Sequence, residues 1–412
     1  LKIDIEKHSQ KLVNYLSDEG GVIEANVVER ILKKKFKAPE QECLDFFHYT
    51  PTMPTEIMHI PPIPSSTEPR PSTFLFCAQT NLSYRTTSNR TMSSNCGAKF
   101  CRYVVMSSVE NGWICIQAML PSPVYENGLG PRLLGVFPGG RFEEFIPSRP
   151  LEHDEVAHPR ICSLLARILP RFHSTAVPIA KRPSILKVMR EWLTLFEEQG
   201  NSHVQIQSTS FHLHSSDFPS SVSTNDLAKE IDIIEEFLGT SPSPVVFCHN
   251  DLTSGNLLIS STPRETTRPL ATEDISLNTT ATLSLSLIDF EFSSYNYRGF
   301  DLANYFCASA IKHNVQEFPH YKIDLNKLQN QPVKIEFCKE YVQEAKKLNI
   351  HINSEFSLLW EIDYFTPVVH LFWAIFNLYC EKDTLAMMDC GIYARDRLAL
   401  YYYTRSIFYN GK

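Results

Sequence analysis

The chain has 412 residues, of which 43% are apolar and 21% are charged. These fractions are close to globular averages and exclude a collagen-like, coiled-coil or wholly disordered chain. Acidic residues outnumber basic ones by 46 to 39, and the resulting net charge of −7 argues against a nucleic-acid binder driven by bulk electrostatics. At about 150 residues per domain, this length predicts two or three domains.

The 11 cysteines are scattered, odd in number and without a Cys-x-x-Cys pair. This pattern favours free thiols in a reducing, cytoplasmic compartment over a disulfide framework or a structural zinc module. No secretory signal is visible, and the longest apolar stretch, residues 364–380, contains Pro367, His370 and Asn377. A membrane span needs about 20 mostly apolar residues, so this stretch predicts a buried core helix.

The N-terminal half is predicted to be rich in strands. Residues 1–50 read as helices, whereas the Pro- and Ser-rich residues 51–73 suit neither a helix nor a sheet interior. Short β-like runs follow at 74–77, 100–106 and 113–116, and residues 134–137 and 142–146 predict a hairpin.

The C-terminal half is predicted to be mainly helical. Helical periodicity covers residues 161–172, 185–198, 227–238 and most of the chain from Val333 onward. Strands are predicted at 245–247 and 285–288, a Ser-rich loop at 200–224, and a flexible Ser/Thr-rich insertion at 260–284. We therefore expect two parts, an N-terminal lobe over residues 1–150 and a C-terminal lobe over residues 151–412.

Two segments, residues 247–256 and 287–291, each end a short apolar strand and present carboxylates. Phosphoryl transfer needs an acid beside the attacking hydroxyl and oxygen ligands for Mg²⁺. Asp251 is followed five positions later by Asn256, and Asp289 begins an Asp-Phe-Glu run further along the chain. This spacing and order are those of the catalytic and metal-binding residues of protein kinases.

Each of these pieces also has a structural interpretation. A lone Asp after a strand is usually a turn former, and the Asp289-Phe290 pair alone is a weak signal. The His-Asn-Asp run with Asn at the fixed offset is stronger, and the two segments in order favour a functional site.

The sequence resembles the choline kinases over about residues 100–412. Residues 241–251 and 288–301 are similar to the two signature segments of that family, and the second is long and specific. Residues 129–133, 145–151 and 393–398 are similar to it too. Ethanolamine kinases carry a related version of the second signature, and this one is closer to the choline form.

The resemblance implies an α+β, protein-kinase-like two-lobed fold, with a small strand-containing N-terminal lobe and a large, mainly helical C-terminal lobe. It implies transfer of the ATP γ-phosphate to the choline hydroxyl, with Mg²⁺, to give phosphocholine for phosphatidylcholine biosynthesis. Two alternatives stay open: a kinase of the same fold acting on ethanolamine or another small alcohol, and a catalytically weak member acting as a binding protein. A homodimer is possible, and no nucleic-acid partner or membrane span is expected.

Carried over by position, the resemblance makes Asp251 the base that accepts the hydroxyl proton. Asn256 and Asp289 would hold Mg²⁺, and residues 144–146 would be the hinge whose backbone meets adenine. Arg298 and Asp301 are expected to brace the signature loop rather than touch substrate. The residues expected around ATP are Arg102, Glu144, Ile146, Arg149, Thr253 and Asp289.

A quaternary ammonium is best held by aromatic faces, because it donates no strong hydrogen bond. Phe292, Trp373, Phe376 and Tyr393 match the aromatic positions of the family's choline site. Trp373 and Phe376 lie in an apolar run, and plain core packing is the structural alternative for both.

Several positions depart from the family pattern. Ala308 stands where the family has an acid that faces the choline nitrogen, so cation affinity or specificity should be reduced. No glycine occurs in residues 69–73, before the strand expected to follow the phosphate loop. Gln117 replaces the helix-borne Glu partner of the phosphate-binding basic residue, and Pro121 and Pro123 are expected to break that helix.

Overall fold

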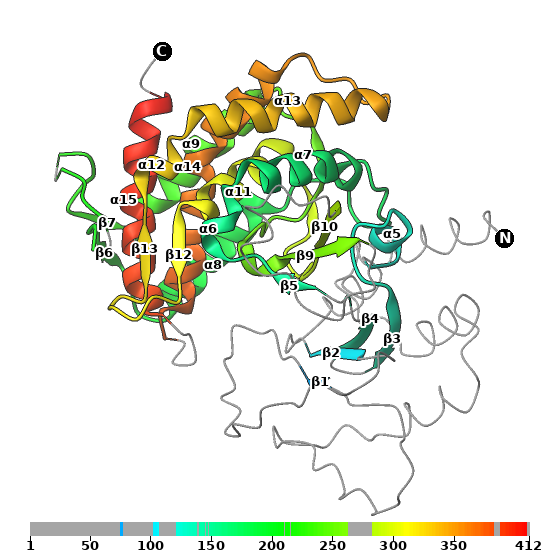
Figure 1. The fold of residues 1–412 in the computed structure, drawn as a ribbon. Coiled ribbons are helices and arrows are strands. Elements are labelled where there is room, and N and C mark those ends of the chain that lie inside the picture. Colours follow the sequence, from blue (N-terminus) through cyan, green and yellow to red (C-terminus); the bar gives the residue numbers. More distant parts are fainter. Residues whose placement is uncertain are drawn as a thin grey trace, which may run out of the picture. The chain divides into compact units, whose positions relative to one another are not determined.

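The computed structural model describes residues 75–76, 102–106, 121–137, 140–144, 146, 148–209, 211–214, 216–262, 282–382 and 388–409. These residues fall into two compact units, one of four strands and one that holds residues 121–131 and the chain from Ile146 onward (Figure 1). The division at residue 150 into an N-terminal and a C-terminal lobe stays a prediction.

The strand unit is a four-stranded sheet in the order β1-β2-β4-β3. Its strands are β1 (Leu75–Phe76), β2 (Arg102–Met106), β3 (Leu133–Phe137) and β4 (Gly140–Glu144). β3 and β4 pair antiparallel with Phe137 opposite Gly140, so the predicted hairpin is confirmed. The predictions for residues 1–50, 51–73 and 113–116, and for Gln117, lie outside the described residues.

The second unit contains small antiparallel sheets beside its helices. β8 (Val245–Cys248) pairs with β11 (Ser294–Tyr297), and β9 (Leu257–Thr262) lies between β10 (Thr282–Leu287) and β5 (Arg149–Pro150). The strands predicted at 245–247 and 285–288 are thus confirmed as β8 and β10. β12 (Ile311–His313) and β13 (Tyr321–Ile323) form a further pair.

Helices make up most of the second unit. Its helices are α5 (Pro121–Glu126), α6 (His153–Val156), α7 (Pro159–His173), α8 (Ile185–Glu198), α9 (Thr224–Thr240), α11 (Arg298–Ser309), α12 (Leu325–Leu328), α13 (Gln331–Lys347), α14 (Glu355–Tyr379) and α15 (Cys390–Tyr409). Single 3-10 turns lie at Ser254–Asn256 and Cys380–Lys382. The helices predicted at 161–172, 185–198 and 227–238 are confirmed as α7, α8 and α9.

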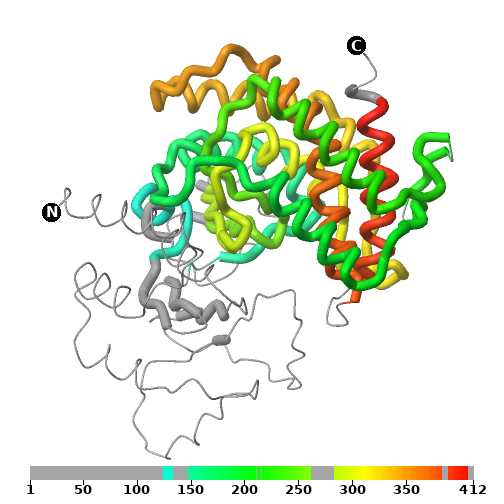
Figure 2. Tube along the Cα trace, turned by 180° about the vertical axis from the view of Figure 1, so that it is seen from behind, coloured from blue at the N-terminus to red at the C-terminus, as the bar shows by residue number. Residues whose placement is uncertain are grey.

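Helix α14 is the centre of this unit. It packs against α8, α11, α13 and α15, and α15 runs beside it in both views (Figures 1 and 2). Residues 365–375 are buried without interruption, so the helix is apolar all round and the predicted buried core helix is confirmed. Among the described residues, no helix combines the length and the apolarity that a membrane crossing requires.

Close packing of α11 on α14 depends on Gly299. A Cβ atom at this position would lie under 3.0 Å from ring carbons of Phe365, a distance that no side chain tolerates. The glycine therefore lets the first turn of α11 approach the middle of α14, which fixes the helix that carries Asp301.

The prediction of a loop over 200–224 was wrong for two short segments. β6 (His203–Gln205) and β7 (Ser221–Ser223) pair antiparallel, with Val204 opposite Val222. Both valines are buried and most of their neighbours are exposed. One buried side chain per strand gives too short an alternation for a sequence pattern to show.

One further expectation needs correction. The insertion predicted over 260–284 is shorter, because β9 continues to Thr262 and β10 starts at Thr282. Pro121 and Pro123 are described as part of α5, and because Gln117 lies outside the described residues, the expectation that they break its helix stays a prediction.

Candidate active site

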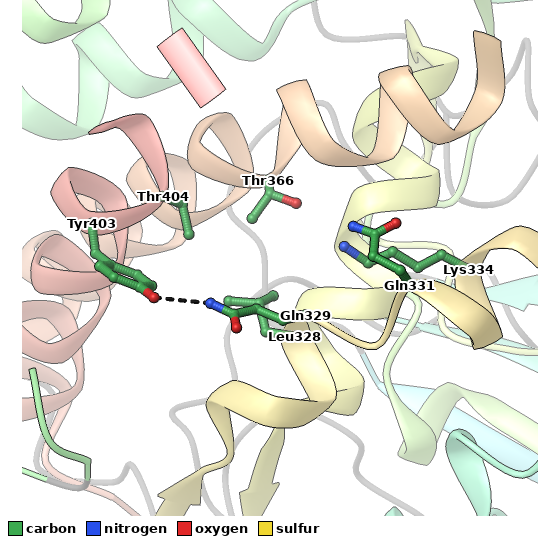
Figure 3. Close-up of a pocket in the computed structure, with 7 residues that line it drawn as sticks. All are labelled: Leu328, Gln329, Gln331, Lys334, Thr366, Tyr403 and Thr404. Carbon is green, nitrogen blue, oxygen red and sulfur yellow. Dashed lines mark hydrogen bonds between the residues drawn. The ribbon is translucent and has the colours of Figure 1, made fainter. Parts of the chain in front are cut away.

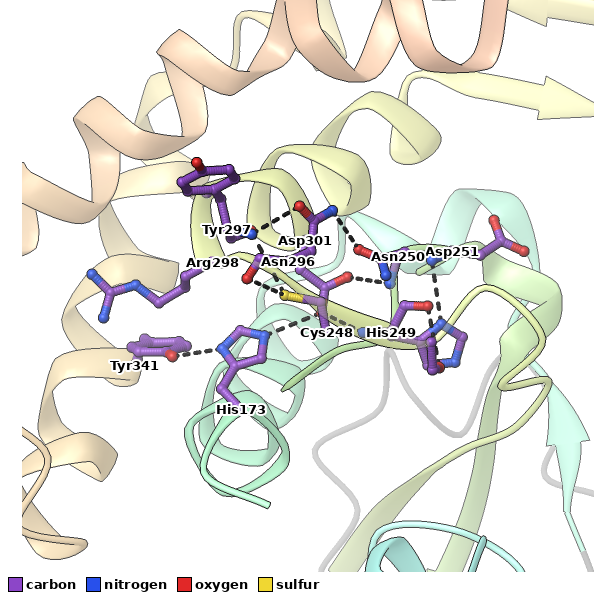
Figure 4. Close-up of polar contacts among 12 residues, drawn as sticks. His173, Cys248, His249, Asn250, Asp251, Asn296, Tyr297, Arg298, Asp301 and Tyr341 are labelled. Carbon is purple, nitrogen blue, oxygen red and sulfur yellow. Dashed lines mark hydrogen bonds and ion pairs between the residues drawn. The ribbon is translucent and has the colours of Figure 1, made fainter. Parts of the chain in front are cut away.

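The end of β8 places a polar turn directly after a buried strand. Asn250 adopts a left-handed backbone conformation, with φ of 66°. The backbone N–H groups of His249 and Asn250 donate to the two carboxylate oxygens of Asp301, at 2.8 and 2.7 Å. Asp301 is fully buried on α11, so it fixes the turn that presents Asp251. In Figure 4 the Asp251 carboxylate lies on the opposite side of this cluster from Tyr341.

The His249 ring joins this turn to the segment that follows β10. Its Nε2 donates to the carbonyl oxygen of Ile288 at 2.9 Å, because a carbonyl can only accept. Its Nδ1 then accepts the backbone N–H of Asp251 at 3.3 Å. Burial lowers the pKa of His249, which agrees with a neutral ring that uses both nitrogens as hydrogen-bonding groups. The histidine therefore couples the positions of Asp251 and Ile288.

Asn256 contacts Asp251 directly. Its Nδ2 group donates to the Asp251 carboxylate at 2.8 Å and to the Asp251 carbonyl at 2.9 Å. The backbone carbonyl of Asn256 accepts the N–H of Ile288 at 3.1 Å, which ties the same two segments together a second time. Asp289 follows Ile288 and adopts a left-handed conformation, with φ of 63°. The structure thus brings Asp251, Asn256 and the segment of Asp289 to one place.

The electrostatics of Asp251 reflect this crowding. Burial, and then the charge of Asp289, raise the pKa of the Asp251 carboxyl to about 7, while the hydrogen bond from Asn256 opposes the rise. A carboxyl with a pKa near neutrality is strongly perturbed, and such groups gather at sites that do chemistry.

A second set of polar contacts lies behind the turn (Figure 4). Asp301 also accepts a hydrogen bond from Nε2 of His173 at 3.1 Å, and Nδ1 of His173 contacts the Tyr341 hydroxyl at 2.7 Å. The Cys248 thiol donates to the Asn296 carbonyl at 3.5 Å.

His173, Cys248 and Asp301 are spaced closely enough to ligate a metal ion, with their candidate ligand atoms within 4.8 Å of one another. Burial raises the pKa of the Cys248 thiol well above its ordinary value, and metal ligation needs the thiolate. Because His173 and Asp301 are held by hydrogen bonds, we interpret the cluster as structural.

Arg298 also stabilises the signature loop. Its guanidinium forms a buried ion pair with Glu361 of α14, through Nε at 3.0 Å and through NH2. Glu361 accepts the Ser243 hydroxyl at 2.9 Å as well. These contacts show Arg298 and Asp301 bracing this loop, and the expectation that neither touches substrate stays a prediction.

Three of the four predicted choline-site rings lie together. The ring centroid of Phe292 lies 5.2 Å from Trp373 and 5.7 Å from Phe376, and the Trp373 and Phe376 centroids are 5.5 Å apart. All three pairs meet edge to face, so the rings form one wall with no gap between them. Phe292 and Phe376 are half-buried, whereas Trp373 is buried and donates from Nε1 to Asn304 at 2.8 Å.

Tyr393, the fourth predicted ring, packs in a neighbouring group. Its ring centroid lies 4.8 Å from Tyr321 and 5.5 Å from His313, and its hydroxyl accepts a hydrogen bond from Arg397 at 2.8 Å. Within the described residues it makes no ring contact with the three-ring wall. Asp251 is among the charged groups that raise the pKa of Tyr393, after burial, which places the tyrosine in the electrostatic range of Asp251.

The residues predicted around ATP are spread over both units. Arg102 and Glu144 lie opposite each other in the β2–β4 pair of the strand unit. In the second unit, Arg149 makes a bidentate contact to the buried Glu155, with both N···O distances at 2.6 Å. The Ile146 carbonyl accepts the Ser148 hydroxyl at 2.8 Å.

Thr253 lies in the turn between Asp251 and Asn256. Its N–H donates to the Asp251 carbonyl at 2.9 Å, and its carbonyl accepts the N–H of Asn256 at 3.1 Å. Thr253 therefore helps to set the geometry between the two candidate side chains.

Comparisons with known proteins identify the family. The model of the family described as choline/ethanolamine kinase matches residues 118–402. Choline kinase B1 of Caenorhabditis elegans is 36% identical over 297 residues, which cover 69% of this chain and 74% of the relative. The chain belongs to the choline/ethanolamine kinase family. The human choline/ethanolamine kinase is 31% identical over 298 residues, covering 70% of this chain and 68% of the relative.

Solved structures of choline/ethanolamine kinases share the fold of this chain. The choline kinase of Cryptosporidium parvum superposes with a TM-score of 0.52 at 20% identity, covering 71% of this chain and 78% of its own. The ethanolamine kinase of Plasmodium vivax gives a TM-score of 0.51 at 20% identity, covering 71% and 73%. The predicted protein-kinase-like α+β fold and the predicted choline kinase-like phosphotransferase are confirmed at the level of the family, and family and fold imply ATP use.

Sequence reasoning missed several residues that organise this family site. Asn250 donates from Nδ2 to the Phe292 carbonyl at 2.8 Å and accepts from Asn296 at 2.9 Å, which joins the turn after β8 to β11. Trp192 of α8 packs against Phe376 with the two rings tilted and their centroids 4.9 Å apart. Asn250 lies inside the first signature segment, whereas nothing in the sequence marks Trp192.

A small cavity of about 30 Å³ lies elsewhere in the second unit (Figure 3). Gln329 donates to the Tyr403 hydroxyl across it at 2.9 Å, and Lys334 forms a buried ion pair with Asp363 at 2.8 Å. Its lining consists of Leu328, Gln329, Gln331, Lys334, Thr366, Tyr403 and Thr404. None of the predicted site residues lines it, and its volume suits a single water molecule.

Proposed function

We propose that this chain transfers the γ-phosphoryl group of ATP to the hydroxyl of choline, giving phosphocholine and ADP. The observation that carries the proposal is the Asp251 carboxylate, which Asn256 holds at 2.8 Å at the end of β8 and which Asp289 affects electrostatically. The choline oxygen bonds to the γ-phosphorus, its proton passes to Asp251, and the bond from phosphorus to the bridging oxygen of ADP breaks.

Asp251 has the position and the support that a base requires. The Asn256 amide and the His249 ring fix its side chain and its backbone, so the carboxylate is oriented before substrate binds. Its second carboxylate oxygen, Oδ1, receives no hydrogen bond from any described residue and is available to the hydroxyl of the substrate.

We propose Asn256 and Asp289 as the residues that hold Mg²⁺. Because Nδ2 of Asn256 faces Asp251, its Oδ1 atom points elsewhere and accepts no hydrogen bond from the described residues. Amide and carboxylate oxygens are the ligands that Mg²⁺ takes in proteins, so this donor set fits the ion. When bound, Mg²⁺ neutralises charge on the phosphates.

We propose that the wall of Phe292, Trp373 and Phe376, with Tyr393 beside it, receives the trimethylammonium group. The three wall rings contact one another, so we place the cation against the wall, where Phe292 and Phe376 are half-buried, rather than between the rings. The hydrogen bond from Trp373 to Asn304 fixes the orientation of the largest ring.

We propose that Arg102, Glu144, Ile146, Arg149, Thr253 and Asp289 contact ATP. Arg102 and Glu144 belong to the strand unit, and we propose residues 1–150 as the nucleotide-binding lobe and residues 151–412 as the catalytic lobe. Arg149 is the most constrained of them, because both its terminal nitrogens already contact Glu155.

The test is a phosphoryl-transfer assay of the purified full chain with ATP, Mg²⁺ and choline, followed by phosphorus NMR. We expect phosphocholine and ADP in equal amounts, and none when EDTA replaces Mg²⁺. Nucleotide binding without any phosphorylated alcohol would contradict the proposal and favour a catalytically weak binding protein.

Ethanolamine is the second candidate acceptor. The human relative is named a choline/ethanolamine kinase, and a plant relative, 32% identical over 255 residues, is named a probable ethanolamine kinase. The primary ammonium of ethanolamine can donate hydrogen bonds, whereas the wall of rings offers aromatic faces and no hydrogen-bond acceptor. We therefore expect choline to have the higher kcat/KM. A higher kcat/KM for ethanolamine would reverse this assignment.

We propose that this reaction takes place in the cytoplasm and supplies phosphatidylcholine synthesis. Support comes from the cysteines of the described part of the chain, all of which are free thiols, as expected in a reducing compartment: Cys162, Cys248, Cys307, Cys338, Cys380 and Cys390. Fractionation of cells expressing the full chain tests the location, and light scattering of the purified protein tests whether it forms a homodimer.

A further inference from the structure

Arg397 on α15 is a buried cation without a carboxylate partner. The residue is 4% exposed, and no acidic side chain of the described residues forms an ion pair with it. Its Nε atom is buried and has no hydrogen-bond partner in the structure. An arginine stays protonated in proteins, so a full positive charge lies inside this part of the molecule.

The groups that contact Arg397 are neutral. Its NH1 group donates to Nδ1 of His370 at 2.9 Å, and Nε2 of the same ring lies 3.7 Å from the Cys307 thiol. Burial, and then Arg397, lower the pKa of His370 well below its ordinary value, so this ring is uncharged. Burial and Arg397 likewise lower the pKa of His313 to about 4. Within the described residues, the side chains that contact Arg397 are therefore neutral, and Arg397 acts on a carboxylate at longer range, because its charge opposes the rise in the pKa of Asp251.

Arg397 also makes a cation–π contact with the ring of Tyr393. Its guanidinium carbon lies 5.1 Å from the ring centroid, within the range of a cation–π contact, and NH2 donates to the Tyr393 hydroxyl at 2.8 Å. The tyrosine ring that we place beside the substrate ammonium thus already holds one cation. A second cation near the same ring meets both a reduced attraction and direct repulsion.

We propose that Arg397 is a positioning and specificity-determining residue: it fixes Tyr393 and biases the acceptor site against a permanently cationic alcohol, relative to a neutral alcohol of the same shape. This inference rests on the proposed function, because it takes the rings as the place of the ammonium group. It goes further, because it assigns a charge preference to a residue that does not touch the reacting atoms.

The size of the effect follows from the separation of the charges. Two unit charges about 10 Å apart near a protein surface interact strongly enough to change a binding constant by roughly fivefold to tenfold. The repulsion applies to choline and not to its neutral isostere dimethylbutanol, in which carbon replaces the nitrogen. Displacement of the Tyr393 ring would weaken both ligands together.

The experiment measures the dissociation constants of choline and of dimethylbutanol by calorimetry, for the full chain and for three variants. Arg397→Gln removes the charge and retains a hydrogen-bond donor, Arg397→Lys retains the charge, and Tyr393→Phe removes only the hydroxyl. We expect Arg397→Gln to shift the ratio of the two constants roughly fivefold to tenfold in favour of choline. Arg397→Lys and Tyr393→Phe should leave that ratio within about twofold of the parent chain.

An unchanged ratio in Arg397→Gln, or an equal shift in Arg397→Lys, would overturn the inference and leave Arg397 with a structural role. If Arg397→Gln does not fold, the salt dependence of the ratio in the parent chain decides instead. We expect added salt to improve choline binding relative to dimethylbutanol, and no change would overturn the inference. These binding measurements need no turnover. A failure of the proposed function is therefore distinguished from a failure of this inference, because it would appear as the absence of phosphocholine in the assay of the parent chain.

Discussion

Two carboxylates of the same unit, Asp251 and Asp301, differ strongly in their burial and in the hydrogen bonds that they accept. Asp301 is fully buried and accepts hydrogen bonds from two backbone N–H groups and from His173. Asp251 is half-buried, receives one side-chain donor from Asn256, and has a pKa raised to about 7 by burial and by Asp289.

The contrast separates a carboxylate that builds the site from one that is available for a reaction. A buried charge is tolerated when hydrogen bonds satisfy it, and then it holds structure together. A carboxylate with a perturbed pKa and an oxygen that accepts no hydrogen bond lowers the free energy of unfolding. Such carboxylates are found mainly in active sites. The following measurements test this comparison, first through the free energy of unfolding at one pH, from the largest expected effect to the smallest, and then through its pH dependence.

Replacing Asp301 with asparagine should have the largest effect on folding. The introduced amide would turn an NH2 group toward a backbone N–H that now meets an oxygen, and the charge that both N–H groups contact would be lost. We expect Asp301→Asn to lower the free energy of unfolding by about 4 kcal/mol in urea titrations. A loss below about 1 kcal/mol would show that Asp301 is not structural.

Glu361 supports the same scaffold through its buried pair with Arg298. Glu361→Gln leaves the guanidinium buried without a charged partner, and we expect a loss of about 3 kcal/mol. Glu340→Gln is the matched control, because the Arg167–Glu340 pair is 2.9 Å long but Arg167 is half exposed. That variant should lose less than about 1 kcal/mol, and equal losses would contradict the account.

Gly299 tests how closely α11 must approach α14. Gly299→Ala places a Cβ atom under 3.0 Å from the Phe365 ring, and we expect a loss of about 2 kcal/mol from overpacking. Gly239→Ala in α9 is the control, because nothing lies within 4 Å of the added atom. Alanine favours a helix more than glycine does, so that variant should gain about 0.5 to 1 kcal/mol. The two glycine-to-alanine substitutions should therefore change the free energy of unfolding in opposite directions.

Asp251 adds a pH dependence to the stability of the folded chain. Its pKa is about 7 in the folded chain and 3.8 in the unfolded chain, so the folded state binds more protons between these values. Stability contributed by the protonated form is therefore lost as the pH rises from about 4 to about 7. Without Mg²⁺, the stability of Asp251→Asn relative to the parent should therefore rise by up to about 4 kcal/mol between pH 4 and pH 8, at about 1.4 kcal/mol for each unit of pKa shift. A constant difference across this range would contradict the shifted pKa.

The sequence predicts the long elements of the second unit well. α7, α8 and α9 carry apolar residues at helical spacing over several turns, and α14 contains nearly all of the longest apolar stretch of the chain, so these patterns are readable without the fold. β6 and β7 were missed because each has three residues and one buried side chain. Helix α11 was not predicted, because it follows β11 without a polar break and is buried on all sides.

The candidate site was predictable only where chain order carries information. Asp251, Asn256 and Asp289 follow strands in a readable order, and the structure brings their segments together through His249 and Ile288. The neutral surroundings of Arg397 depend on side chains from α11, α14 and α15, and no spacing in the sequence reports such a contact.

The central claim is that Asp251 is the carboxylate that takes the proton from the alcohol. The most direct measurement is the turnover of choline by Asp251→Asn at saturating ATP and Mg²⁺, together with its unfolding free energy at the same pH. We expect kcat to fall by about a hundredfold to ten-thousandfold while stability is kept or increased. Turnover close to that of the parent chain, in a variant that is folded and binds ATP, would contradict the assignment.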